Sequence, residues 1–148
     1  MRKLIITRKH SIFGWAKKLQ VYVSDFENNE LEICDIPCKK IGILKNDESA
    51  TFEIDNDTCR VFVIGDKGTR NYCCDSIHIN AGSADVELTG KCKFNPARLN
   101  AFNFSGDPDE MAKRYRGNAN RNGSIMIAGI IIVAVFLGIA IFSLPIWG

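Results

Sequence analysis

The stretch "LQVYVSD", Leu19–Asp25, determines the fold class of this 148-residue chain. Apolar and polar side chains alternate along it, with Leu19, Val21 and Val23 on one side and Gln20, Tyr22 and Ser24 on the other. Successive side chains of a strand point to opposite faces of a sheet. The alternation therefore predicts a β-strand that buries one face.

Similar short segments occur on both sides of this strand. They are "KLIIT", "LEICDI", "KKIGILK", "ATFEID", "CRVFVIG", "YCCDSIHIN", "VELTG" and "KCKFNPARLNAFNF". Turn-forming residues separate them about every eight to twelve residues, and Pro37 is expected to end "LEICDI". Since no helical pattern here is long enough to cross over a parallel sheet, residues 1–105 are predicted to form a mainly β domain, a small antiparallel β-sandwich.

Residues 106–123 have a different composition. Asp107 fits a helix N-cap, Pro108 the first helical position and Gly117 the position after the last turn. We therefore predict a short juxtamembrane helix at 108–116, followed by a polar connector, "GNANRNGS". The segment carries four basic residues, which are Lys113, Arg114, Arg116 and Arg121.

Residues 124–147 contain the longest apolar run of the chain. There is no polar side chain from Ile125 to Phe142, and a helix of about 20 apolar residues crosses a bilayer core. We predict one C-terminal transmembrane helix, with Trp147 at the far interface. Ala134 and Gly138 form a small-xxx-small pair that would allow association between copies of this helix.

The position of the basic residues predicts the orientation of this single-pass chain. Positively charged residues next to a membrane helix stay on the cytoplasmic side. Lys113, Arg114, Arg116 and Arg121 precede the apolar run, so the N-terminal domain is expected to be cytoplasmic and the protein tail-anchored. An external domain of inverted topology, with disulfides, is the alternative.

The charges of the chain are segregated along the sequence. Residues 1–20 hold six basic residues and no acid, whereas residues 21–110 hold all 17 acids and nine basic residues. The basic block next to the apolar run is expected to lie among anionic lipid headgroups. The N-terminal block is expected to be a solvated strand and loop. The acidic middle segment argues against nucleic acid as a partner.

The segment "HSIFGWAKK", His10–Lys18, places aromatic residues among cations. One interpretation is a loop that inserts Ile12, Phe13 and Trp15 among lipid headgroups. The other is a connection between strands that packs these side chains inward. We favour inward packing, because aromatic residues in small domains are mostly part of the core.

Six cysteines are the strongest candidates for chemistry. Cys34 and Cys38 are spaced like a metal-binding pair, which makes them weak zinc candidates, but a second spaced pair is missing because Cys73 and Cys74 are adjacent. In a reducing compartment buried thiols that act as small apolar side chains are the simpler interpretation. No catalytic motif is recognisable, and no cofactor is expected.

The run "VYVSD…IGIL…ATFEID…CRVFVIG" resembles PEGA-like small β-sandwich modules of membrane-tethered bacterial proteins. The likeness covers about the central third of the chain and lacks the glycine of the family's "VYVDG"-type turn, which reads Ser24-Asp25-Phe26 here. The resemblance implies a β-sandwich and transfers no functional residue. Together these features predict a membrane-tethered, non-catalytic interaction module with a protein partner. A cysteine-based zinc or redox module is the alternative.

Overall fold

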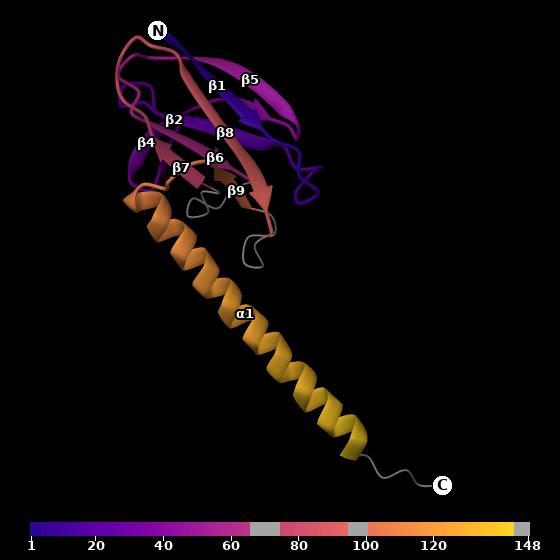
Figure 1. Ribbon diagram of the computed structural model, residues 1–148. Coiled ribbons are helices and arrows are strands. Elements are labelled where there is room, and N and C mark those ends of the chain that lie inside the picture. Colours follow the sequence, from indigo (N-terminus) through magenta and orange to yellow (C-terminus); the bar gives the residue numbers. More distant parts are fainter. Residues whose placement is uncertain (66–74, 95–100, 144–148) are drawn as a thin grey trace.

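The computed structural model describes residues 1–65, 75–94 and 101–143; for Ala101 and for helix residues 115–123 and 140–143 it describes the backbone alone. Nine strands and one long helix make up this part of the chain (Figure 1). The strands are β1 (Arg2–Arg8), β2 (Leu19–Ser24), β3 (Leu31–Ile33), β4 (Ile36–Leu44), β5 (Glu48–Ile54), β6 (Arg60–Ile64), β7 (Asp75–His78), β8 (Val86–Lys93) and β9 (Ala101–Phe104), and the helix is α1 (Glu110–Ser143).

The strands form two sheets that share one apolar core. The first sheet has the order β5-β1-β8-β9 and the second the order β3-β4-β2-β6-β7. Leu4 and Ile6 of β1 meet Val21 of β2 and Val61 of β6 in this core, and all four are fully buried. The predicted mainly β fold with two packed layers is therefore confirmed, and the alternation in "LQVYVSD" does point Val21 and Val23 inward.

One pairing contradicts the purely antiparallel sandwich. β1 and β8 run parallel, with Leu4 opposite Val86 and Arg8 opposite Gly90, whereas the other strand pairs are antiparallel. Parallel neighbours need a long crossover, and in the described residues between β1 and β8 this connection consists of strands β2 to β7 and loops rather than a helix. The prediction of a purely antiparallel sandwich was wrong because it assumed that only a helix can connect two parallel strands.

The segment "LEICDI" is a hairpin rather than one strand. Cys34 and Asp35 have positive φ angles of 57° and 62°, and Ile33 pairs with Ile36 across them. Two consecutive left-handed residues match the twist of a two-residue hairpin turn. Pro37 was predicted to end a strand, but it lies within β4, opposite Glu32.

The helix differs in its length and in its start. A single helix, α1, covers the region in which a helix at 108–116, a connector and a second helix were predicted. Asn and Gly each cost a helix up to about 1 kcal/mol, but extending an existing helix is easier than starting a new one. Asp109, not Asp107, is the N-cap: its Oδ1 accepts a hydrogen bond from the Ala112 amide at 2.8 Å.

Candidate functional site

The start of α1 is attached to the edge of the second sheet through Asp109. Its Oδ2 accepts a hydrogen bond from Arg60 Nη1 at 2.8 Å and another from the backbone amide of His78 at 3.1 Å. Because its Oδ1 caps α1 at the same time, this one carboxylate joins β6, β7 and the helix. The direction in which α1 leaves the sandwich is thus fixed by polar contacts.

Apolar packing supports the same junction. Tyr22 and Phe62 point to the outer face of the second sheet and form a small cluster with Ile33 and Cys38, against which Met111 of α1 packs. Ala112 in the next position is fully buried. The sequence placed Tyr22 on the polar face of this strand, but the residue is buried. The first turn of α1 and the β3–β4 hairpin cover that face of the sheet.

The pKa of Asp109 reflects these contacts. Partial burial alone would raise the pKa of the carboxyl, but the Ala112 amide, the Arg60 guanidinium and the His78 amide together lower it below its ordinary value. Asp109 is therefore a carboxylate at neutral pH, as an N-cap and an ion-pair partner both require.

From this junction α1 runs past one end of the sandwich. We call this the loop end: β1, β4, β6 and β8 finish there, and it carries residues 9–18, residues 45–47 and Phe94. Figure 1 shows that β8 and α1 point to the same side, with the C-terminal part of α1 beyond the sandwich. We call the opposite end, with residues 25–30, 34–35, 55–59 and 79–85, the far end.

A fully buried arginine holds the main loop of the loop end. Arg8 is 0% exposed, and its guanidinium donates to the carbonyl oxygens of Lys17 at 2.6 Å, Gly14 at 2.7 Å and Leu44 at 3.2 Å. Ser11 adds a hydrogen bond from its Oγ to the Cys92 carbonyl at 2.8 Å. The loop thus has a defined backbone path. The sequence did contain a sign that Arg8 is buried, because it lies on the same face of β1 as the core residues Leu4 and Ile6.

The apolar side chains of this loop point outward, which contradicts the inward packing that we favoured. Ile12 is 73% exposed, Trp15 68% and Phe13 39%. Phe13 contacts the ring of Phe94, itself 62% exposed, at a centroid distance of 5.8 Å. The core that these residues were expected to fill is occupied instead by Phe102, Phe104 and the aliphatic residues of both sheets.

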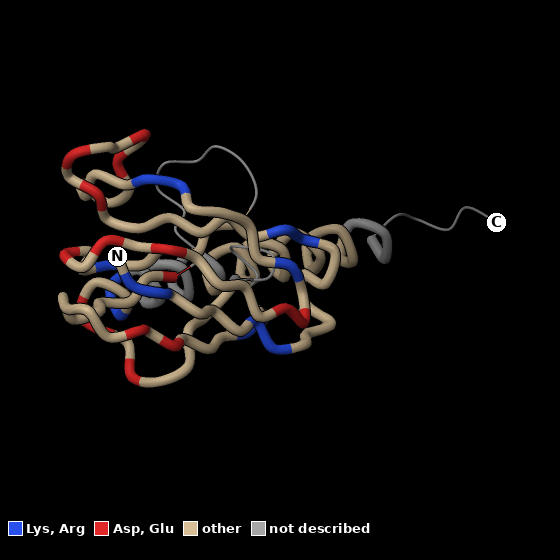
Figure 2. Tube along the Cα trace, turned by 90° about the horizontal axis from the view of Figure 1, so that it is seen from above, with Lys and Arg blue, Asp and Glu red and all other residues tan. Residues whose placement is uncertain are grey.

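The two ends of the sandwich differ in charge. The far-end loops carry seven acids and no lysine or arginine, namely Asp25, Glu27, Glu30, Asp35, Asp55, Asp57 and Asp85, and the strand ends beside them add the basic residues Arg2, Lys3 and Arg60. Around the described loop end lie six lysines and two acids, which are Lys9, Lys17, Lys18, Lys45, Lys91, Lys93, Asp47 and Glu48. In Figure 2 the acidic segments lie mainly at the end of the sandwich remote from the C-terminus. The basic and aromatic residues therefore coincide at the loop end.

The predicted membrane-interface residues belong to α1 or follow it. Lys113 and Arg114 are exposed, and Lys113 Nζ lies 2.9 Å from Glu110 Oε1, which raises the pKa of the lysine. Arg116 and Arg121 lie in the helix, in the part where the side chains are outside the description, and Trp147 lies outside the described residues. The basic residues of α1 therefore come immediately after the turn that attaches the helix to the sandwich.

The predicted zinc pair belongs to the apolar cluster at the junction, against which Met111 also packs. Cys34 is half-buried in the β3–β4 turn, while Cys38 is fully buried and its Sγ donates to the Ile36 carbonyl at 3.1 Å. Burial raises the pKa of the Cys38 thiol to about 12, which disfavours the thiolate that zinc requires. Within the described residues no three metal-binding side chains gather, and the four cysteines there form no disulfide. Cys73 and Cys74 lie outside the description.

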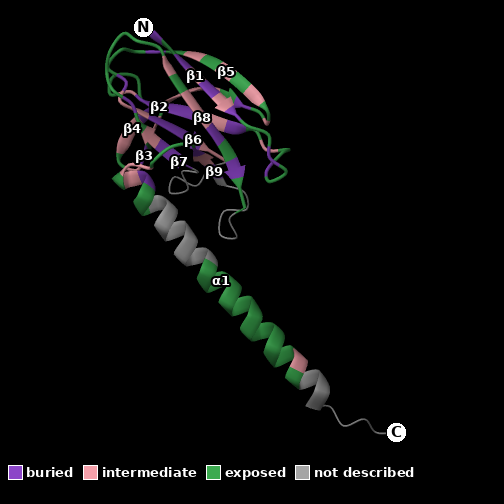
Figure 3. Ribbon diagram, in the orientation of Figure 1, coloured by how far each residue is buried: buried purple, intermediate pink, exposed green. Residues whose placement is uncertain are grey.

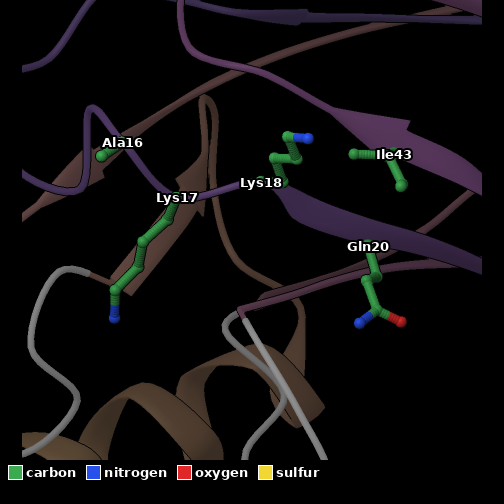
Figure 4. A pocket seen from close by; sticks show the side chains of 5 residues that line it. All are labelled: Ala16, Lys17, Lys18, Gln20 and Ile43. Carbon is green, nitrogen blue, oxygen red and sulfur yellow. The ribbon is translucent and has the colours of Figure 1, made fainter.

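A hollow of about 350 Å³ adjoins the loop end, lined by Ala16, Lys17, Lys18, Gln20 and Ile43. Figure 4 shows that the amino groups of Lys17 and Lys18 point away from each other. Polar groups that converge on one point are what orients a small ligand. The two lysines therefore do not form a ligand-binding centre there.

The apolar part of α1 is exposed wherever its side chains are described. Every described residue from Ser124 to Ile139 is exposed except Gly138, which is intermediate (Figure 3). Among the residues that the structure describes, no helix meets the combined length and apolarity that a membrane span requires.

No protein-family model matches this chain, and no curated protein matches it significantly.

Proposed function

We propose that this protein is a membrane-tethered, non-catalytic interaction module. Its β-sandwich is the working domain and the apolar half of α1 is the anchor. The observation that carries the proposal is a helix whose large apolar side chains are exposed along its described C-terminal part. Ile130, Ile131, Val133, Phe136 and Leu137 are each more than half exposed.

Water is an unfavourable surrounding for such a surface. Monomeric soluble proteins rarely expose contiguous apolar patches of more than a few hundred Å², and larger patches mark interaction or membrane surfaces. In the sequence the apolar side chains continue without a break to Phe142, and α1 extends to Ser143. Lipid is the medium that solvates a helix apolar on all sides.

The basic flank supports an orientation with the sandwich in the cytoplasm. Lys113, Arg114, Arg116 and Arg121 precede the apolar segment, and positively charged residues next to a membrane helix remain cytoplasmic. In this orientation the domain stays near other proteins of the same membrane, which raises its effective concentration toward them. Ala134 and Gly138 are a further candidate contact between copies of the helix.

The acidic far end supports a protein partner rather than a nucleic acid. Its loops carry seven acids, which outnumber the three basic residues Arg2, Lys3 and Arg60 on the adjoining strand ends, and this net negative charge disfavours phosphate groups. α1 starts beside this end, where Asp109 contacts Arg60 and His78, but its C-terminal part lies away from it, so a partner could approach the far end without obstruction by the bilayer. We therefore expect a partner with a basic surface.

Flotation of the full-length protein with liposomes tests the anchor. The wild type should float and resist alkaline extraction. In I131R/V135R each arginine at the helix centre costs about 2.5 to 3.5 kcal/mol of insertion, so the variant should largely remain in the soluble or aggregated fraction. T51R/N80R, which places two arginines at exposed positions of the sandwich, is the matched control and should float. A wild type that does not float would contradict the proposal.

A further inference from the structure

We propose that the loop end docks on the anionic surface of the membrane that holds α1, so that the sandwich has a fixed orientation on the bilayer. This inference rests on the proposed anchor. It concerns a surface formed by residues 9–18 together with Lys91, Lys93 and Phe94, which we call the docking surface. The ligand is a bilayer containing acidic phospholipid.

The composition of the docking surface matches a lipid interface. Ile12 and Trp15 are 73% and 68% exposed, and exposed Lys9 and Lys18 flank them in the same loop. Membrane-surface segments combine aliphatic and aromatic side chains, which enter the headgroup boundary, with cations that attract anionic lipid. Lys91 and Lys93 point outward from β8 on either side of buried Cys92 and extend the basic area.

The backbone of the loop is organised to present these side chains. Arg8 binds the carbonyls of Gly14 and Lys17, which lie on either side of Trp15. The Phe13 amide donates to Ser11 Oγ at 3.1 Å, and Gly14 has a φ of 65°, a left-handed angle that glycine adopts without strain. A loop fixed in advance loses little conformational freedom on binding, so exposure of Ile12 and Trp15 is a property of the fold.

The course of α1 favours lipid over an acidic protein as the ligand. Asp109 and Met111 attach the helix to the second sheet, and α1 then passes the loop end on its way out of the domain (Figure 1). An anchored α1 therefore places a bilayer on the side of the sandwich where the docking surface lies. The acidic far end is directed away from that bilayer, which avoids repulsion from anionic headgroups.

The two tryptophans of the chain allow a direct test. In W147F, Trp15 is the single tryptophan, and its emission reports the polarity around the loop. The full-length variant is inserted into nanodiscs of phosphatidylcholine alone or mixed with phosphatidylglycerol. We expect a blue-shifted Trp15 emission, and quenching by lipids brominated on the acyl chains, in the anionic nanodiscs, with a return toward the water-exposed spectrum at high salt.

Charge reversal provides the matched comparison. A lysine near an anionic surface contributes about 1 kcal/mol, a factor of about five, so K17E/K18E in the W147F background should lower the docked-to-undocked ratio at least about 25-fold. K39E/K40E, an adjacent pair in β4, changes the net charge equally and should leave the Trp15 emission unchanged. Circular dichroism of each variant verifies the fold. The effect of salt on the Trp15 emission of W147F, which keeps all lysines of the docking surface, provides an independent readout.

The outcomes separate the two proposals. If the protein inserts but Trp15 stays water-exposed in both lipid mixtures, the docking inference is wrong while the anchor stands. Equal effects of K17E/K18E and K39E/K40E would also overturn docking. A Trp15 shift that occurs only on addition of an acidic polypeptide would assign the surface to a protein instead. Failure to insert at all would contradict the anchor itself.

Discussion

Replacement of Asp109 by alanine should release the first turn of α1 from the sandwich. The change removes the cap on the Ala112 amide, worth about 1 kcal/mol, and the 2.8 Å ion pair with Arg60. The side chains of this pair are 13% and 26% exposed, so the ion pair should exceed an exposed one and contribute about 1 to 2 kcal/mol. Together the losses amount to about 2 kcal/mol or more at the junction.

Amide hydrogen exchange of the full-length protein in micelles measures this directly. A loss of about 2 kcal/mol in opening free energy should accelerate exchange of the Ala112 and His78 amides roughly 30-fold. D109N separates the two contributions: asparagine caps as well as aspartate, so Ala112 should stay protected while the contact with Arg60 and His78 weakens. D107A is the control, because Asp107 is exposed. Unchanged exchange at both amides in D109A, or equal acceleration in D107A, would show that Asp109 does not hold the helix.

Three other outcomes follow from the described contacts. The pKa of Asp109 in the folded protein lies below its ordinary value of 3.8, so the carboxylate stabilises the junction fully above pH 3.8 and loses this effect as the pH falls through the lowered pKa. Exchange of the Ala112 amide should therefore accelerate in that acidic range in the wild type but not in D109N. An equal response of both proteins would contradict this role of Asp109. R8M leaves the carbonyls of Gly14, Lys17 and Leu44 without their donor, so thermal unfolding should report a destabilisation of about 2 kcal/mol or more, and an unchanged melting temperature would exclude Arg8 as the support of the loop. Cys38, buried and with a pKa raised to about 12, should react with iodoacetamide at neutral pH far more slowly in the folded protein than after denaturation, as peptide mass spectrometry would detect, whereas equal rates would mean that its site is open.

Local patterns in the sequence identified the layers of the fold but not their pairing. Alternation in β2 and β6 places Val21, Val23, Val61 and Val63 in the core, as the structure confirms. The parallel contact of β1 with β8 depends on residues about eighty positions apart, which no local pattern encodes. The β3–β4 turn was missed for a related reason, since Cys34 is an unusual residue at a left-handed position and Asp35 occupies the second such position, where glycine is most common.

The loop end shows where composition is an unreliable guide. Statistics of burial favour aromatic residues in the core, yet Trp15 and Ile12 are exposed because the carbonyls bound by Arg8 fix the loop in an outward course. Similarly, Asp107 and Pro108 form a good helix start in the sequence, but Asp109 is the residue that reaches Arg60 and His78. In both cases a side-chain contact that the local sequence pattern does not reveal determines the local structure.

Hydrogen–deuterium exchange of residues 125–142 in the wild-type protein, reconstituted in nanodiscs and read by mass spectrometry, tests the membrane anchor without any substitution. A helix surrounded by hydrocarbon has its backbone hydrogen bonds shielded from water, so these amides should remain protected long after those of the adjacent segment 113–121 have exchanged. If residues 125–142 exchange as fast as that polar segment, α1 is not in the bilayer and the tethered module that we propose is wrong.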